Sequence, residues 1–218
     1  MKRSLIAQII ILATALCTAH AKENVVQCAN LIYAGTHTSR CFSDEFLSEA
    51  NRNSSVQTER RFKSVKLASK ELFNFPFVMM TGEEDFHFTA EERNNLKHYL
   101  NNGGFLLASA GCSSKDWNRA FRREMRSVFG KDDLKPIPAD HPVFHTVKDI
   151  DKLILHDKTA ASEAQLEGIR KKGKLVVIYS PHGLNDTAHT EGCCCCGGNE
   201  IENALDVNVN ILIYALLH

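Results

Sequence analysis

The sequence predicts a single α/β domain in which helices cover both faces of a mainly parallel β-sheet. Several apolar runs have the length and composition of buried strands, and segments with helical periodicity lie between them. The chain has 218 residues and contains no Pro/Gly/Ser-rich linker that would divide it, which favours one domain over two. Alternating strands and helices of this kind predict a doubly wound sandwich of three layers.

The first 21 residues predict a secretory signal peptide. Lys2 and Arg3 give a positive start, and residues 5–16 form an apolar run that is too short to span a bilayer comfortably. Ala19-His20-Ala21 supplies the small-x-small site that a signal peptidase needs. We therefore expect a mature domain of residues 22–218, exported to the periplasm or the extracellular space, without membrane attachment after cleavage. An uncleaved anchor is the alternative.

The first half of the mature chain predicts two strands, a helix and an edge strand. Residues 25–35 are rich in β-branched and apolar side chains and end at a glycine, as a strand does. Ser43 is the expected N-cap of a helix that ends near residues 51–55. Residues 56–67 carry too many charges for a central strand and suit an edge, whereas residues 75–80 are continuously apolar and suit a strand buried on both faces.

The best-defined unit follows in residues 89–110. Thr89 is the expected N-cap of a helix, Gly103-Gly104 ends that helix, and residues 105–110 form the next apolar strand. A strand, a helix and a strand at this spacing form a right-handed parallel βαβ unit. The remaining expected elements are a helix over 115–129, a strand over 174–180 and a closing helix over 201–217, with Leu205, Val209, Leu212 and Leu216 on its inner side.

Charge and composition exclude two broad classes. The chain has 26 basic and 26 acidic residues, so it lacks the basic excess with which a general polyanion binder neutralises phosphates. We therefore expect no nucleic-acid partner. A hydrophobic content of 44% is too high for a disordered protein.

Six ordered segments resemble an uncharacterised bacterial family, domain of unknown function 4159. The resemblance extends from about Ala29 to His218. It implies membership of the class I glutamine-amidotransferase-like superfamily and therefore a three-layer, flavodoxin-like sandwich, but it implies no assigned activity. The segments that carry it are residues 72–82, 94–108, 121–125, 138–145, 174–181 and 207–216.

The resemblance raises the question of amidotransferase chemistry. True amidotransferases place a nucleophilic cysteine on a sharp strand-to-helix turn, and a late His-x-Glu pair activates it. Here Ala110 lies nearest the nucleophile position and Cys112 follows two residues later, while His189 and Glu191 have the spacing of the partner pair. Because Cys112 lies two residues past the nucleophile position, it is not on the turn that would activate it. A Cys-His hydrolase is therefore our third hypothesis. The simpler interpretation is that Cys112 is a half-buried residue at a strand end.

Four consecutive cysteines flanked by glycines form the most unusual motif of the chain. One hypothesis is a disulfide framework with Cys28, Cys41 and Cys112 that leaves one thiol over, and export favours it. A second is a zinc or copper site that combines two of the four with His182 and His189, and a third is a redox dithiol with C-x-x-C spacing. The four residues are Cys193, Cys194, Cys195 and Cys196.

Ligands of doubly wound sheets bind beyond the carboxyl ends of the strands, and several polar residues are expected there. These residues come from four separate loops, which we expect to line one crevice. They are His37, Glu84, Asp85, His87, Cys112 and His182.

A second block contains Asp140, His141 and His145, in which an Asp-His pair could orient an imidazole for acid–base chemistry or metal binding. We favour the simpler interpretation that Asp140 caps the turn begun by Pro142. On the preceding helix, we expect Trp117 to lie in the core.

Together these patterns predict an exported binding or interaction module without catalytic activity, whose partner is a protein or a small ligand. The main alternative is a metal- or thiol-dependent enzyme that uses the loop of Cys193–Cys196 with nearby histidines. Neither the ligand nor the cofactor is specified by the sequence.

Overall fold

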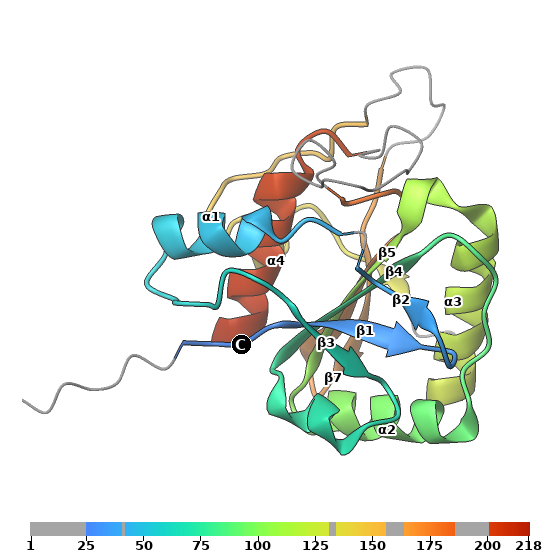
Figure 1. Cartoon of the computed structure of the whole chain (residues 1–218). Coiled ribbons are helices and arrows are strands. Elements are labelled where there is room, and N and C mark those ends of the chain that lie inside the picture. The colour runs from blue at the N-terminus through green and yellow to red at the C-terminus, as the bar shows by residue number, and fades with distance from the viewer. Residues whose placement is uncertain (1–24, 41, 131–133, 156–163, 186–200) are drawn as a thin grey trace, which may run out of the picture.

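The computed structural model describes residues 25–40, 42–130, 134–155, 164–185 and 201–218. Helices lie on both sides of one twisted sheet (Figure 1). The helices are α1 (Glu45–Asn53), α2 (Ala90–Asn101), α3 (Lys115–Phe129) and α4 (Ala204–Leu217). The strands are β1 (Ala29–Tyr33), β2 (His37–Thr38), β3 (Lys63–Lys66), β4 (Phe77–Gly82), β5 (Phe105–Ala110), β6 (Lys135–Pro136), β7 (Glu167–Lys171) and β8 (Lys174–Ser180).

Five strands run parallel to one another, in the spatial order β3-β1-β4-β5-β8. The βαβ unit predicted over residues 75–110 is confirmed as β4-α2-β5, with Phe77 paired to Phe105 and Gly82 to Ala110. Thr89 caps α2 as predicted, and the Thr89 amide donates to Glu92 Oε2 at 2.7 Å, which completes a capping box.

The predicted α/β class is confirmed, and beside its five parallel strands the sheet carries antiparallel ones, so it is mixed. β7 pairs antiparallel with β8, and β6 pairs antiparallel with β7. Lys172 and Gly173 join β7 to β8 with φ angles of 50° and 84°, the left-handed conformation that a tight two-residue hairpin requires.

The short strand β2 lies where the end of β1 diverges from β4. β1 pairs with β4 only through Ala29 and Asn30, whereas Ile32 and Tyr33 pair with β2. The chain therefore fills this gap in the sheet with its own hairpin.

The core has two apolar layers, one on each face of the sheet. Val78 and Met80 of β4 pack toward α2 and α3, while Phe77 and Met79 pack toward α1 and α4. This alternation, with both faces covered, explains the continuous apolar run of the strand. Residues 207–214 of α4 are all buried. The prediction that only one side of this helix faces the core was therefore wrong.

No helix within the described ranges is long and apolar enough to cross a membrane.

Candidate functional site

Three buried hydroxyl side chains tie together the carboxyl ends of neighbouring strands. Ser39 follows β2, Thr81 lies near the end of β4, and Ser109 lies near the end of β5. The Thr81 amide donates to Ser39 Oγ at 3.1 Å, and Thr81 Oγ1 donates to the Ser109 carbonyl at 2.7 Å. Ser109 Oγ accepts from the Leu184 amide at 2.9 Å and donates to the His182 carbonyl at 3.3 Å. This hydroxyl network joins the ends of β2, β4 and β5 to the segment that follows β8.

The turn between β5 and α3 has an unusual backbone. Cys112 and Ser113 both adopt positive φ, at 49° and 51°, a conformation that side-chain-bearing residues rarely use. Ser114 caps α3 by accepting from the Trp117 amide, and its hydroxyl also donates to the Glu83 carbonyl. The loops that follow β4 and β5 are therefore joined to each other.

Cys112 is disulfide-bonded, and its Sγ lies 3.7 Å from Glu83 Oε1. In this state it offers no thiolate for nucleophilic attack. Cys28, the other described cysteine, is free and fully buried, and burial raises its pKa to about 12. It therefore does not join the proposed disulfide framework and suits the role of the one thiol left over.

Beneath the turn, Tyr33 and Trp117 pack against Gly82. Trp117 Nε1 donates to Tyr33 Oη at 2.8 Å, and that hydroxyl donates to the Thr81 carbonyl at 2.9 Å. A Cβ on Gly82 would lie 2.3 Å from Tyr33 Oη, so only glycine fits at this strand end. Trp117 is fully buried, which confirms its expected place in the core.

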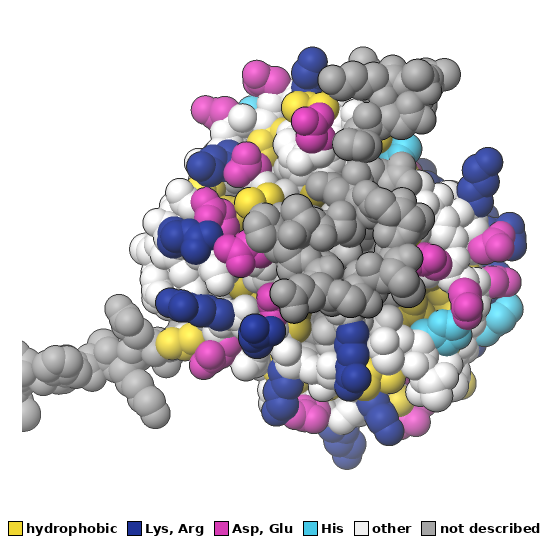
Figure 2. Space-filling model, turned by 45° about the horizontal axis from the view of Figure 1, so that its top comes forward, with side chains coloured by type: hydrophobic (Ala, Val, Ile, Leu, Met, Phe, Trp, Pro, Cys, Tyr) yellow, Lys and Arg dark blue, Asp and Glu magenta, His cyan; other side chains and the backbone are white. Residues whose placement is uncertain are grey.

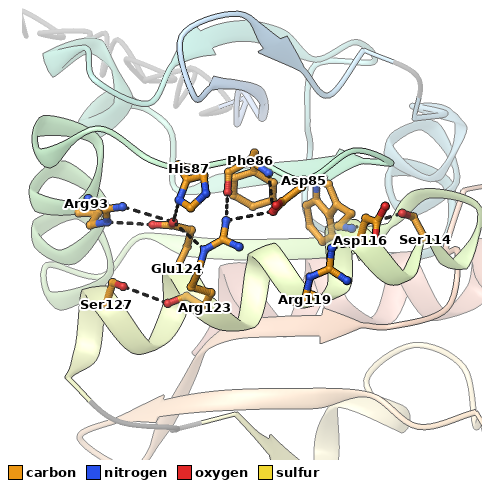
Figure 3. A network of polar contacts seen from close by, with 11 residues as sticks. Asp85, Phe86, His87, Arg93, Ser114, Asp116, Arg119, Arg123, Glu124 and Ser127 are labelled. Carbon is orange, nitrogen blue, oxygen red and sulfur yellow. Dashed lines mark hydrogen bonds and ion pairs between the residues drawn. The ribbon is translucent and has the colours of Figure 1, made fainter.

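Glu124 of α3 is the centre of a cluster of charged side chains, although only 1% of its side chain is exposed (Figure 3). Arg93 of α2 donates to its carboxylate at 2.8 and 3.3 Å. His87 Nδ1 and Arg123 Nε each lie 3.6 Å from Glu124 Oε1. The cluster joins α2, α3 and the loop after β4.

Two predicted crevice residues belong to this arrangement. Asp85 pairs with Arg123 at 3.0 Å, and that guanidinium lowers the pKa of the carboxyl group. His87 faces Glu124, as Figure 3 shows. Both side chains therefore hold the loop after β4 against α3. The sequence offered no spacing that would pair either of them with helix 115–129.

The other predicted crevice residues remain at the carboxyl edge. The His37 ring stacks on Tyr33 with 5.6 Å between centroids. Burial raises the pKa of the Tyr33 hydroxyl, and the charge of exposed Glu84 adds to this effect. The His182 carbonyl accepts from Ser109. His189, Glu191 and the run Cys193–Cys196 lie outside the described residues.

The block of Asp140, His141 and His145 lies elsewhere. The His141 ring contacts that of Tyr214. Tyr214 lies ten residues after Ala204, the first residue of α4, and hence about 15 Å farther along the helix axis. His141 Nδ1 accepts from the Val143 amide at 3.2 Å and thereby caps the 3-10 helix Pro142–Phe144. The prediction that Asp140 is this cap was wrong.

The two histidines of this block have pKa values that move in opposite directions. Burial lowers the pKa of His141. Asp149, 3.1 Å from His145 Nδ1, and the Ala139 carbonyl, 3.1 Å from Nε2, raise the pKa of His145.

Among the residues that the structure describes, no three His, Cys, Asp or Glu side chains are placed to hold one metal ion. On the face of the molecule shown in Figure 2, basic and acidic side chains lie side by side among the described residues.

These observations define a class: an α/β protein with helices on both faces of a mixed sheet, and with a fixed cluster of loops at the carboxyl edge of its parallel strands. The chain belongs to the family described as Domain of unknown function (DUF4159), whose model matches residues 27–216. The resemblance stated from the sequence is thereby confirmed. Among curated proteins, none matches this chain.

Proposed function

We propose that this protein is an exported binding module without catalytic activity, and that its ligand or protein partner docks on the carboxyl edge of the sheet. We further propose that the fold is flavodoxin-like, as in the amidotransferase-like superfamily. Numbered along the chain, the five parallel strands have the order 2-1-3-4-5, which is the flavodoxin order.

The turn Gly111–Ser113 is the observation that carries the proposal. Two successive left-handed residues without glycine cost on the order of 1–3 kcal/mol each, and such residues cluster at functional sites. The turn adjoins the hydroxyl network of Ser39, Thr81 and Ser109, so a docked molecule would meet a rigid surface. In flavodoxin-like sheets the ligand lies between the first and the third parallel strand, counted along the chain. Here these strands are β1 and β4, and β2 fills the gap between them. The neighbouring ends of β4 and β5 are therefore the better docking place.

The absence of catalysis is inferred from how the reactive side chains are engaged. Cys112 is disulfide-bonded, and Asp85 is paired with Arg123. An acid–base or nucleophilic role needs such groups to be free to react.

Export is supported by two features. The segment 1–21 has the pattern of a signal peptide, and the Cys112 disulfide suits an oxidising compartment.

The alternative remains a zinc-, copper- or thiol-dependent enzyme that uses Cys193–Cys196. Elemental mass spectrometry with a denaturing thiol count, on mature protein exported by its host, separates the two functions. The binding module predicts no stoichiometric metal and one free thiol, Cys28. One zinc or copper per chain, lost in the double variant Cys193→Ser/Cys196→Ser, would contradict the module and establish the metal site.

The docking place is tested by native mass spectrometry of protein purified from the host. We expect a bound molecule in the wild type that is lost in Glu84→Arg, because Glu84 is exposed at the carboxyl edge. The matched control is Glu91→Arg on the exposed side of α2, which should retain it. A molecule that stays bound in Glu84→Arg would place the site elsewhere, and turnover of a γ-glutamyl amide that depends on Cys112 would establish the hydrolase instead.

A further inference from the structure

A pocket of about 360 Å³ lies beside the carboxyl end of β8, on the β6–β7 side of the sheet. It opens between the segment that follows β6 and the residues that lead into β7, and it contains none of the hydroxyl network. Its volume is within the range of roughly 300–1,000 Å³ that small-molecule sites occupy.

Four apolar side chains form the inner wall of this pocket, and polar groups line much of the rest. Ile137, Phe144, Ile150 and Leu166 line it, and each is no more than 6% exposed. An apolar group of a ligand would fill it favourably.

The mouth of the pocket is charged with both signs. Asp151 and Lys152 are exposed, adjacent in the chain and part of the lining. Neither has an ion-pair partner among the described residues. A simple anion would meet the carboxylate of Asp151, and a simple cation would meet the ammonium group of Lys152. A molecule that carries both charges satisfies both side chains.

The walls are held in place by hydrogen bonds that do not involve the pocket's side chains. The Ile137 amide donates to the Leu166 carbonyl at 2.9 Å, which joins the two walls. Asn203, at the N-terminal end of α4, donates to the Lys152 carbonyl at 3.1 Å and accepts from the Ile154 amide at 3.0 Å. The backbone of the charged mouth is therefore fixed before any ligand arrives, which lowers the cost of binding.

We propose that this pocket binds a zwitterionic amino acid with a large apolar side chain, of the phenylalanine or leucine class. The side chain fills the space between Phe144, Ile150 and Leu166, the α-ammonium group pairs with Asp151, and the α-carboxylate pairs with Lys152. This site does not depend on the carboxyl-edge function proposed above, since the two share no residue.

Isothermal titration calorimetry of the mature protein tests the ligand class. We expect L-phenylalanine and L-leucine to bind about 10- to 100-fold more tightly than glycine, because glycine leaves the apolar space unfilled. 3-Phenylpropionate lacks the ammonium group and 2-phenylethylamine lacks the carboxylate, and each should bind about three- to tenfold more weakly than phenylalanine. Equal affinity for phenylalanine and glycine, equal affinity for phenylalanine and uncharged 2-phenylethanol, or no binding of either amino acid at millimolar concentration would overturn the proposal.

Variants locate the site. Ala164 lines the pocket at a half-buried position, so Ala164→Trp should abolish binding, whereas Ser127→Trp on the exposed side of α3 should not. Asp151→Asn and Lys152→Gln are exposed changes that leave the core intact, and each should reproduce the loss seen with the matching single-charge analogue. Lys174→Gln is the charge control. Wild-type affinity in Ala164→Trp at an unchanged melting temperature, or in both charge variants, would contradict the assignment.

Discussion

The two helix layers bury polar side chains of different kinds. Between α2 and α3 the buried group is a charged one, Glu124, which binds Arg93. On the opposite face, α4 buries two neutral amides, Asn208 and Asn210, which bind loop backbone. The charged pair holds two helices and a loop together, whereas each amide anchors one loop to a helix that is otherwise apolar.

This difference has an energetic consequence. Removing one partner of a buried ion pair leaves an uncompensated charge, while removing an amide leaves only neutral backbone groups without a partner. The layer of α2 and α3 should therefore be the more sensitive one to a single polar substitution.

Glu124→Ala is expected to have the largest effect. It should lower the free energy of unfolding by about 3 kcal/mol, because Arg93 loses two hydrogen bonds to a buried carboxylate and Arg123 Nε, already a buried donor without a hydrogen bond, loses the nearby charge. Urea unfolding at neutral pH measures this. Asp116→Ala, which breaks the exposed pair with Arg119 on the same helix, is the control and should cost no more than about 1 kcal/mol. Similar losses in the two variants would show that burial of Glu124 has no special role.

Asn210→Ala should have the next largest effect and sharpens the comparison within the second layer. Asn210 makes three hydrogen bonds, accepting from the amides of Val147 and Lys148 at 3.0 and 2.9 Å and donating to the Lys148 carbonyl at 2.8 Å. We expect a loss of roughly 2–3 kcal/mol from these unmade bonds. Asn208→Ala removes one bond, to the Leu184 carbonyl at 2.8 Å, and should cost about 1 kcal/mol. The reverse order in thermal unfolding would contradict the hydrogen-bond argument.

The smallest expected effect concerns the protonation of His141 and His145 and its contribution to stability as the pH changes. By NMR titration, His145 should have a pKa above its ordinary value and His141 one below it. Because the folded pKa of His145 is raised, its contribution to stability is present below the unfolded pKa and is lost as pH rises through the folded pKa. Asp149→Asn should return the pKa of His145 toward its ordinary value. A pKa that Asp149→Asn leaves unchanged would assign the shift to the Ala139 carbonyl.

Much of the parallel part of the fold could be predicted from the sequence, because its signals are local. Thr89, Gly103 and Gly104 mark both ends of α2, and the apolar runs of β4 and β5 reflect burial on both faces. β7 was not predicted because Glu167–Lys171 contains three charged residues and too few apolar ones to show alternation. Its only clear signal is the Lys172-Gly173 turn. β2 has two residues, and only pairing with β1 defines it.

The candidate site was less predictable, because side-chain direction depends on tertiary packing. The sequence placed Asp85 and His87 in the correct loop, yet α3 turns both toward Arg123 and Glu124. Ser39, Thr81 and Ser109 were missed, since isolated hydroxyl residues at strand ends carry no motif until the strands are aligned. His141 replaced Asp140 as the cap because its ring nitrogen reaches the Val143 amide.

The two outer strands of the sheet bear on how copies of this protein can assemble. β3 places exposed Lys63 and Lys66 along one margin, and β6 ends the other with only two residues, one of them Pro136, which has no amide hydrogen to donate. Adding a further strand at either margin would bury lysine charges or leave carbonyl groups unbonded. At the two margins that the described strands form, these features oppose growth into continuous intermolecular sheets.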